Sequence, residues 1–103
     1  MPRVEYDAAF RTDLSHQLTY LADREDLRAI DRLQADIADL ADMLAIFPLA
    51  GRELARDDGE TLRRIRLRST PFAVWYRFAP TLVEAAVVLH RLFHVRQRTP
   101  RPR

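Results

Sequence analysis

Two histidines near the C-terminal end of the sequence are the side chains best suited to acid–base chemistry. Imidazole gains and loses a proton near neutral pH, and His90 and His94 lie close together in one apolar segment. Arg63 and Tyr76 lie upstream, and a guanidinium can stabilise developing negative charge but is a poor base because it stays protonated. Phosphate chemistry needs an acid, a base and such a stabiliser. His90 and His94 are therefore our candidates for acid–base catalysis.

Each of these histidines also has a simpler interpretation. His90 could be a core or partner-facing residue whose hydrogen bonds are satisfied, and His94 could cap backbone groups at the end of a strand. The alternation of a strand places both on one face, where they would lie about 13 to 14 Å apart. At that distance they could not share a metal ion. Because the chain has no cysteine, thiolate zinc sites and disulfides are excluded, and we expect no metal and no cofactor.

Basic residues are concentrated in the second part of the sequence. Residues 1–60 carry 7 arginines and 14 acidic residues, whereas residues 61–103 carry 10 arginines and one acid, Glu84. This segregation predicts a surface with one strongly positive side, although the two parts could also pack together and neutralise each other. A guanidinium donates two hydrogen bonds to a phosphate at once. We therefore expect target or nucleic-acid binding from Arg64, Arg66, Arg68, Arg77, Arg91 and Arg96.

Two amphipathic helices are predicted in the first half of the sequence. Asp7 is a typical N-cap residue, and an apolar stripe of about four turns follows it. After a polar connection over 23–26, a longer stripe extends to Phe47 and stops at Pro48. Such a short connection predicts an antiparallel hairpin. The stripes are Phe10, Leu14, Leu18 and Leu21, and then Leu27, Ile30, Leu33, Ile37, Leu40, Leu44 and Phe47, with Asp31, Asp36, Asp39 and Asp42 between them.

Strands are predicted before and after this hairpin. Residues 3–6 alternate as a short strand, and three later strands are expected over 62–68, 72–78 and 82–94. The short connections between these later strands indicate an antiparallel meander, to which the first strand could add. The sequence therefore predicts an α+β domain in which an N-terminal strand and a helical hairpin pack on a three- to four-stranded antiparallel sheet.

Two local patterns complete this prediction. Residues 49–52 and 56–59 are interpreted as turns or loops, with Asp58-Gly59 as a turn signal. Trp75 and Tyr76 fall on opposite faces of the 72–78 strand, so we expect one of them in the core and the other to be available for binding.

The 103 residues allow one domain, and a hydrophobic content of 48% argues against a disordered chain. We expect a single domain over 1–97 and a flexible, basic, proline-rich tail over 98–103. No apolar run approaches the roughly 20 residues that span a bilayer, and the first six residues contain no apolar signal core. No membrane association is expected, and the predicted location is cytoplasmic.

Five short motifs follow one another along the chain. They are Val4–Phe10 with Asp13-Leu14, Phe47–Arg52 with the pattern FPxxGR, Leu62–Leu67, Pro71–Arg77, and Val88–Gln97. In this order, the motifs resemble the strands, the first helix and the link of the RelE/ParE superfamily of bacterial toxins. The resemblance covers roughly residues 3–97. It implies the toxin of a type II toxin–antitoxin system, which a cognate antitoxin protein neutralises within a hetero-oligomer.

The resemblance leaves two activities open. ParE-like members inhibit DNA gyrase or topoisomerase by direct binding, whereas RelE-like members cut mRNA on the ribosome without a metal. Val95 stands where RelE-like nucleases often carry a tyrosine, so the gyrase inhibitor is our leading prediction. The alternative is an mRNA endoribonuclease that uses His94 and Arg63 with Tyr76 and His90. A binding module that retains only the fold is a third possibility.

Overall fold

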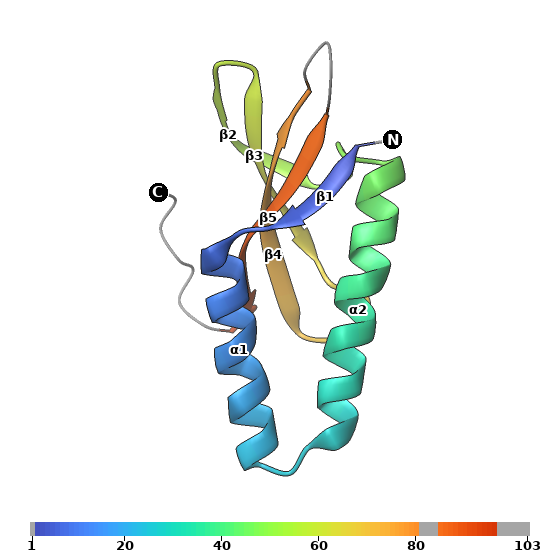
Figure 1. The fold of residues 1–103 in the computed structure, drawn as a ribbon, viewed down its shortest axis with the longest axis vertical. Helices are drawn as coiled ribbons and strands as arrows, with labels where there is room; N and C mark the ends of the chain where they lie inside the picture. The colour runs from blue at the N-terminus through green and yellow to red at the C-terminus, as the bar shows by residue number, and fades with distance from the viewer. Residues whose placement is uncertain (1, 81–84, 97–103) are drawn as a thin grey trace.

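One strand and two helices precede the four strands that complete a sheet (Figure 1). The computed structural model describes residues 2–80 and 85–96. The five strands form a sheet in the order β1-β5-β4-β3-β2. The predicted α+β class and the helical hairpin are confirmed. The elements are β1 (Arg3–Tyr6), α1 (Ala8–Asp23), α2 (Leu27–Ile46), β2 (Arg52–Asp57), β3 (Glu60–Arg66), β4 (Phe72–Ala79) and β5 (Ala86–His94).

The sheet is larger and more mixed than the sequence predicts. It has five strands instead of three to four, and β1 pairs with β5 in parallel, whereas the other neighbouring strands are antiparallel. The additional strand is β2, which connects and overlaps the two segments, 49–52 and 56–59, that we interpreted as turns or loops. All its residues are exposed, so it lacks the apolar alternation that marks a half-buried strand. The Asp58-Gly59 turn is confirmed, because both residues have the positive φ, 46° and 81°, that a two-residue hairpin requires.

The predicted division into a domain over 1–97 and a tail over 98–103 stays a prediction, because residues 97–103 lie outside the described ranges. The same applies to residues 82–84, at the start of the last predicted strand. Within the described ranges, no helix is long and apolar enough to cross a membrane.

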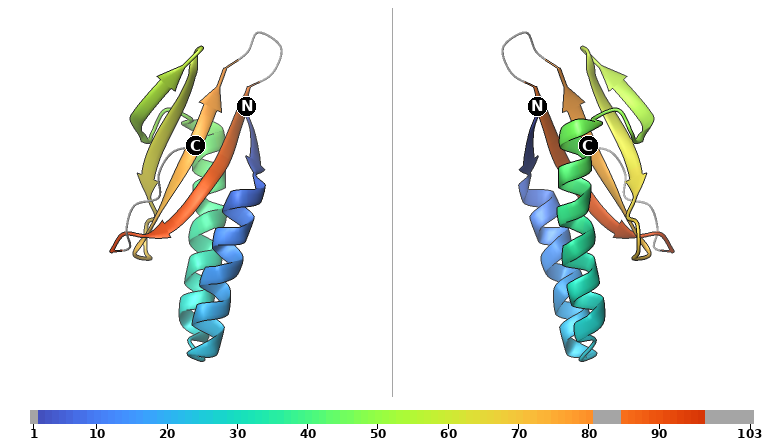
Figure 2. Two further views of the ribbon diagram at one scale, coloured as in Figure 1. Left: turned by 90° about the vertical axis from the view of Figure 1, so that its left-hand side faces the viewer. Right: turned by 90° about the vertical axis from the view of Figure 1, so that its right-hand side faces the viewer.

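Both helices lie on the same side of the sheet (Figure 2). An aspartate caps the start of each helix: Asp7 Oδ1 accepts a hydrogen bond from Phe10 N at 3.0 Å, and Asp26 Oδ1 accepts one from Ala29 N at 3.1 Å. The predicted N-cap at Asp7 is thus confirmed. The helical stripes and the sheet bury one core, which consists of Phe10, Leu33, Ile37, Leu40, Leu44, Leu67, Phe72, Val74, Tyr76, Phe78, Val87, Leu89 and Leu92.

The two ends of the longer stripe do not belong to this core. Leu27 is 70% exposed and Phe47 is 62% exposed. Leu27 lies at the tip of the hairpin, which extends beyond the strands in Figure 1, and Phe47 is the C-cap that follows α2. Periodicity predicts which side of a helix is apolar, but it does not show how far the opposing surface extends.

A buried carboxylate joins α2 to the connection between β3 and β4. In the sequence, Asp36 is one of the aspartates between the apolar residues of the longer stripe, a pattern that predicts an exposed side chain. In the structure, Asp36 is only 4% exposed. It accepts hydrogen bonds from the backbone amides and the hydroxyls of Ser69 and Thr70, at distances from 2.5 to 3.3 Å. Burial acts to raise the pKa of Asp36, but these hydrogen bonds outweigh it and hold the pKa below its ordinary value.

Candidate functional site

The sheet has a face that packs on the helices and an opposite face, which we call the open face. Side chains alternate between the two faces along each strand, and cross-strand partners share a face. Tyr76 belongs to the helix-side core, so its neighbours Trp75 and Arg77 point to the open face. The pairing register assigns the other members of the open face, which are Arg52, Leu62, Arg64, Arg66, Ala73, Val88, Arg91 and Phe93.

A β-bulge in β5 brings His90 to the open face as well. Trp75 pairs with Arg91 whereas the next residue, Tyr76, pairs with Leu89, so His90 is the extra residue of the bulge. The bulge reverses the alternation of the strand. Beyond it, His94 pairs with core residue Phe72. The expectation that His90 and His94 share a face is therefore wrong.

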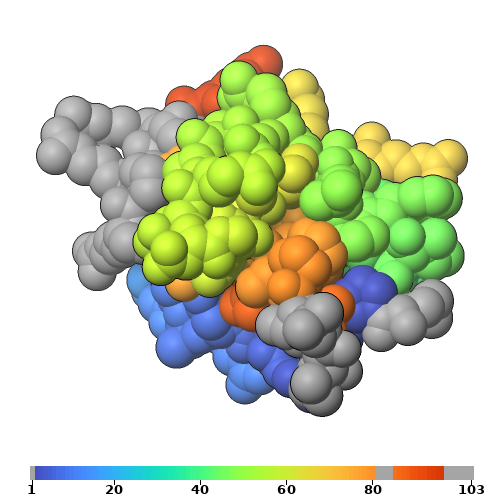
Figure 3. Space-filling view, turned by 90° about the horizontal axis from the view of Figure 1, so that it is seen from above, coloured from blue at the N-terminus to red at the C-terminus, as the bar shows by residue number. Residues whose placement is uncertain are grey.

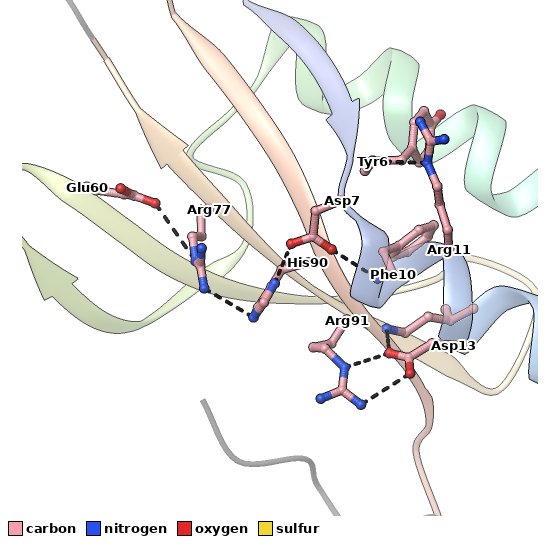
Figure 4. Close-up of polar contacts among 10 residues, drawn as sticks. Tyr6, Asp7, Phe10, Arg11, Asp13, Glu60, Arg77, His90 and Arg91 are labelled. Carbon is pink, nitrogen blue, oxygen red and sulfur yellow. Dashed lines mark hydrogen bonds and ion pairs between the residues drawn. The ribbon is translucent and has the colours of Figure 1, made fainter. Parts of the chain in front are cut away.

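On the open face, His90 forms the centre of a series of polar contacts (Figure 4). Its Nδ1 lies 2.6 Å from Asp7 Oδ2, and its Nε2 lies 3.2 Å from Arg77 Nη2. Arg77 Nε in turn lies 3.9 Å from Glu60 Oε1. Because a guanidinium can only donate hydrogen bonds, His90 Nε2 is the acceptor, and Nδ1 carries the ring proton that is donated to Asp7. The imidazole is thus held between a carboxylate and a guanidinium.

A second ion pair on this face joins β5 to α1. Arg91 donates from Nε and Nη2 to the two oxygens of Asp13, at 2.7 and 3.2 Å. Asp13 Oδ2 also accepts a hydrogen bond from Leu92 N at 3.0 Å. The hydrogen bond with Asp13 raises the pKa of Arg91, so this guanidinium stays charged. Its donors are largely engaged in holding α1 against the sheet.

Arg63 and Tyr76 lie on the helix side, where they anchor the link between α2 and β2. The Tyr76 hydroxyl donates to Pro48 O and accepts from Gly51 N, both at 2.8 Å. Arg63 Nη1 donates to Gly51 O at 2.8 Å and to Leu49 O at 3.4 Å. Burial raises the pKa of Tyr76, which keeps the phenol in the neutral form that these bonds need. These contacts explain why the FPxxGR pattern accompanies an arginine on β3 and a tyrosine on β4.

Trp75 and Tyr76 are both buried, with 3% and 0% of their surface exposed. The expectation that one of them is available for binding is therefore wrong. Trp75 belongs to a small apolar cluster on the open face, together with Ala73 and Phe93. That face buries its aromatic rings and presents its charged side chains.

His94 lies at the end of β5, away from the other candidates. Its Nδ1 accepts a hydrogen bond from Arg96 N at 3.0 Å, which confirms the interpretation that it caps a backbone group. Its ring also makes a T-shaped contact with the ring of Phe72, with centroids 5.3 Å apart. It lines a cavity of about 650 Å³ whose other walls include His16, Tyr20, Asp26, Arg32 and Thr70.

The structure does not bring the four catalytic candidates to one place. Arg63 and Tyr76 contact the same link, His90 lies on the open face, and His94 pairs with Phe72. Phe72 is four residues from Tyr76 along β4, which corresponds to about 13 Å. Sequence reasoning also missed Asp7 and Asp13 as partners of β5, because these contacts join residues 83 and 78 positions apart.

Most of the predicted binding arginines do gather, because Arg64, Arg66, Arg77 and Arg91 share the open face. Arg68 and Arg96 are exposed just beyond the ends of β3 and β5. Arg52, which we did not predict, joins the group because it pairs with Arg64. The signal that could have identified it was the Asp-Gly turn, which indicates a strand on each side.

The end of α2 exposes an apolar surface. Ile46, Phe47 and Leu49 are 60%, 62% and 59% exposed. Together with Pro48, Ala50 and Phe78, they line a groove of about 600 Å³. Figure 3 shows the end of α2 in green on the same side of the molecule as the yellow-green β2–β3 hairpin. Exposed apolar surfaces of this kind are typical of sites for protein partners.

Among the described residues, no three histidine or carboxylate side chains gather in a way that could hold a metal ion.

Comparison with known families gives a match over most of the chain. A family model described as "ParE toxin of type II toxin-antitoxin system, parDE" matches residues 4–98. No individual curated protein matches the chain. The family match extends from Val4 in β1 to beyond the end of β5, and the chain therefore belongs to the ParE toxin family of type II toxin–antitoxin systems.

Proposed function

We propose that this toxin acts by binding DNA gyrase or a related topoisomerase in the cytoplasm, and that its cognate antitoxin blocks this binding. The observation that carries the proposal is the separation of the four catalytic candidates. An acid, a base and a charge stabiliser must lie within hydrogen-bonding reach of one reacting group. Arg63 and Tyr76 instead hold the link after α2, and His94 lies at the far end of β5.

Inhibition of gyrase-catalysed supercoiling by the purified toxin tests the proposal directly. We expect micromolar toxin to leave relaxed plasmid unconverted, and added cognate antitoxin to restore supercoiling. In cells that express the toxin alone, DNA synthesis should stop first, with an SOS response. Unimpaired supercoiling together with an early stop in protein synthesis would contradict the proposal. Normal growth would indicate a relative that retains only the fold.

The exposed apolar groove at the end of α2 is our proposed contact for the antitoxin. Antitoxin segments that fold on binding bury apolar side chains in such grooves. Phe47→Ser should weaken neutralisation by the antitoxin at least tenfold and leave toxicity intact, since Phe47 is 62% exposed and outside the core. The matched control is Leu27→Ser, which removes an apolar side chain of similar exposure, 70%, at the other end of α2. Equal effects of the two changes would exclude the groove.

One arrangement favours the RNA-cleaving alternative. A carboxylate that orients an imidazole is typical of a general base, and the Asp7–His90 pair has this form, with Arg77 beside it. A ribosome-dependent endoribonuclease built on this pair predicts that His90→Ala abolishes mRNA cleavage and toxicity. Under our leading proposal, His90→Ala and His94→Ala both remain toxic and inhibit gyrase, provided that circular dichroism shows a folded protein.

A further inference from the structure

The positive charge of the open face is unevenly available across the sheet. On the side of β1 and β5, the arginines and the histidine of the open face have acidic partners: Arg3 pairs with Glu5, His90 with Asp7, and Arg91 with Asp13. On β4, Arg77 lies near Glu60. Within residues 2–80 and 85–96, Arg52, Arg64 and Arg66 form no ion pair. The uncompensated charge is therefore concentrated on β2 and β3.

These three arginines form a compact group. Arg64 and Arg66 are two residues apart on β3 and thus about 6.8 Å apart along the strand, and Arg52 is the cross-strand partner of Arg64, at roughly 5 Å. Arg52 and Arg66 are exposed and Arg64 is half-buried. The Arg64 guanidinium carbon lies 5.7 Å from the centroid of the Phe93 ring, so Phe93 supports the guanidinium without accepting hydrogen bonds from it in the ring plane. Three fork-shaped donors at this spacing suit a row of phosphates.

We propose that Arg52, Arg64 and Arg66 on the open face bind the phosphate backbone of duplex DNA. The inference goes beyond the proposed function, because binding of gyrase requires no contact between the toxin and DNA. Single-stranded nucleic acid is bound mainly by stacking of its bases on exposed aromatic rings. Here Trp75 and Phe93 are only 3% and 4% exposed, so the face offers charge without a stacking surface. In a duplex the bases are already stacked, and its phosphates are accessible.

The proposed contacts are independent of base sequence and depend strongly on salt. Each phosphate contact with duplex DNA releases condensed counterions, so the logarithm of the binding constant falls by about 0.9 per contact for each tenfold rise in salt. Three contacts therefore predict a slope of about −2.7. The arginines of β4 and β5 contribute less, because their donors are engaged with Glu60, His90 and Asp13.

Fluorescence anisotropy with a labelled duplex of random sequence tests the proposal between about 50 and 200 mM salt. The wild-type protein should bind with the slope given above, and the double variant Arg64→Gln/Arg66→Gln should reduce it to about −0.9 and weaken binding at least tenfold at low salt. The matched control is Arg28→Gln/Arg32→Gln, which removes the same charge from exposed positions on α2. Thermal melting monitors the folding of both variants.

Several outcomes would overturn the proposal: no binding, a slope near zero, or equal losses in the double variant and its control. Tighter binding of a single strand of equal length would exclude the duplex. Displacement of the duplex by polyglutamate at matched charge concentration would instead assign the face to an acidic protein partner. The supercoiling assay separates this inference from the proposed function. A toxin that inhibits gyrase but binds no duplex would overturn only the DNA contact. A toxin that binds the duplex but does not inhibit gyrase would overturn only the gyrase proposal.

Discussion

Arg63 and Arg64 are neighbours in β3, but they belong to opposite faces of the sheet. The Arg63 side chain is 12% exposed, and it donates to the carbonyls of Leu49 and Gly51. The Arg64 side chain points to the open face, where it forms no ion pair with any residue that the structure describes. The same residue type therefore supports the fold on one face and is available for binding on the other. Substitutions on the two faces should accordingly change different properties.

The largest effect on stability is expected where the link meets the helix face, at Gly51. An added Cβ would lie 2.7 Å from Tyr76 Cε1, 2.8 Å from its hydroxyl and 3.0 Å from Arg64 O. Gly51→Ala would therefore displace the link and weaken its hydrogen bonds, at a cost of about 3 kcal/mol in the free energy of unfolding. Urea denaturation measures this change. Ala50→Ser, at the exposed neighbouring position, is the control and should stay within about 0.5 kcal/mol.

A smaller but still large loss of stability is expected when the contact between α2 and the β3–β4 connection is weakened. Asp36→Asn keeps the shape of the side chain but turns one acceptor into a donor that faces the amides and hydroxyls of Ser69 and Thr70. We expect the free energy of unfolding to fall by about 2 kcal/mol. Asp39→Asn, at an exposed position of the same helix, should leave it nearly unchanged. A neutral result at Asp36 would mean that the connection is not held by this carboxylate.

The same carboxylate predicts the direction of a pH dependence. The pKa of Asp36 is lower in the folded protein than its ordinary value, so the folded state resists protonation of this group. Its contribution to stability is present above the unfolded pKa, which is about 3.9, and is lost as the pH falls through the folded pKa. Urea midpoints of the wild type and Asp36→Asn should therefore converge below about pH 4. Parallel curves down to low pH would show that Asp36 does not contribute in this way.

The comparison between Arg63 and Arg64 is tested most directly by the same substitution at each position. Of the changes considered, these two are expected to have the smallest effects on stability. Arg63→Gln removes charged hydrogen bonds to the link and should cost about 1.5 kcal/mol, whereas Arg64→Gln should stay within about 0.5 kcal/mol. For binding, the order reverses: Arg64→Gln should weaken binding of duplex DNA severalfold, and Arg63→Gln should leave it unchanged. Equal effects of the two changes on either property would remove the distinction between the faces.

Charge segregation along the chain had two interpretations, and each applies to a different part of the open face. Asp7, Asp13 and Glu60 come from the acidic first part of the sequence, and they engage His90, Arg91 and Arg77. This is the mutual neutralisation that we considered. On the open face of β2 and β3, by contrast, Arg52, Arg64 and Arg66 form no ion pair with any described residue, which agrees with a positive side. Net charge along the sequence could not distinguish these regions, because the outcome depends on which strands lie next to α1.

The sequence alone determined the features that depend on neighbouring residues: the two helices and their aspartate caps, the Asp-Gly turn, the alternation of β3, and the five motifs that carry the family resemblance. Local spacing controls these features through backbone hydrogen bonds and the periodicity of each element. Only the tertiary structure decided that β2 is a strand, that Asp36 is buried, and that the bulge at His90 separates it from His94. These properties depend on contacts between residues far apart in the chain, such as Asp7 with His90 across 83 positions, and a single extra residue in a strand reverses the face of every side chain beyond it.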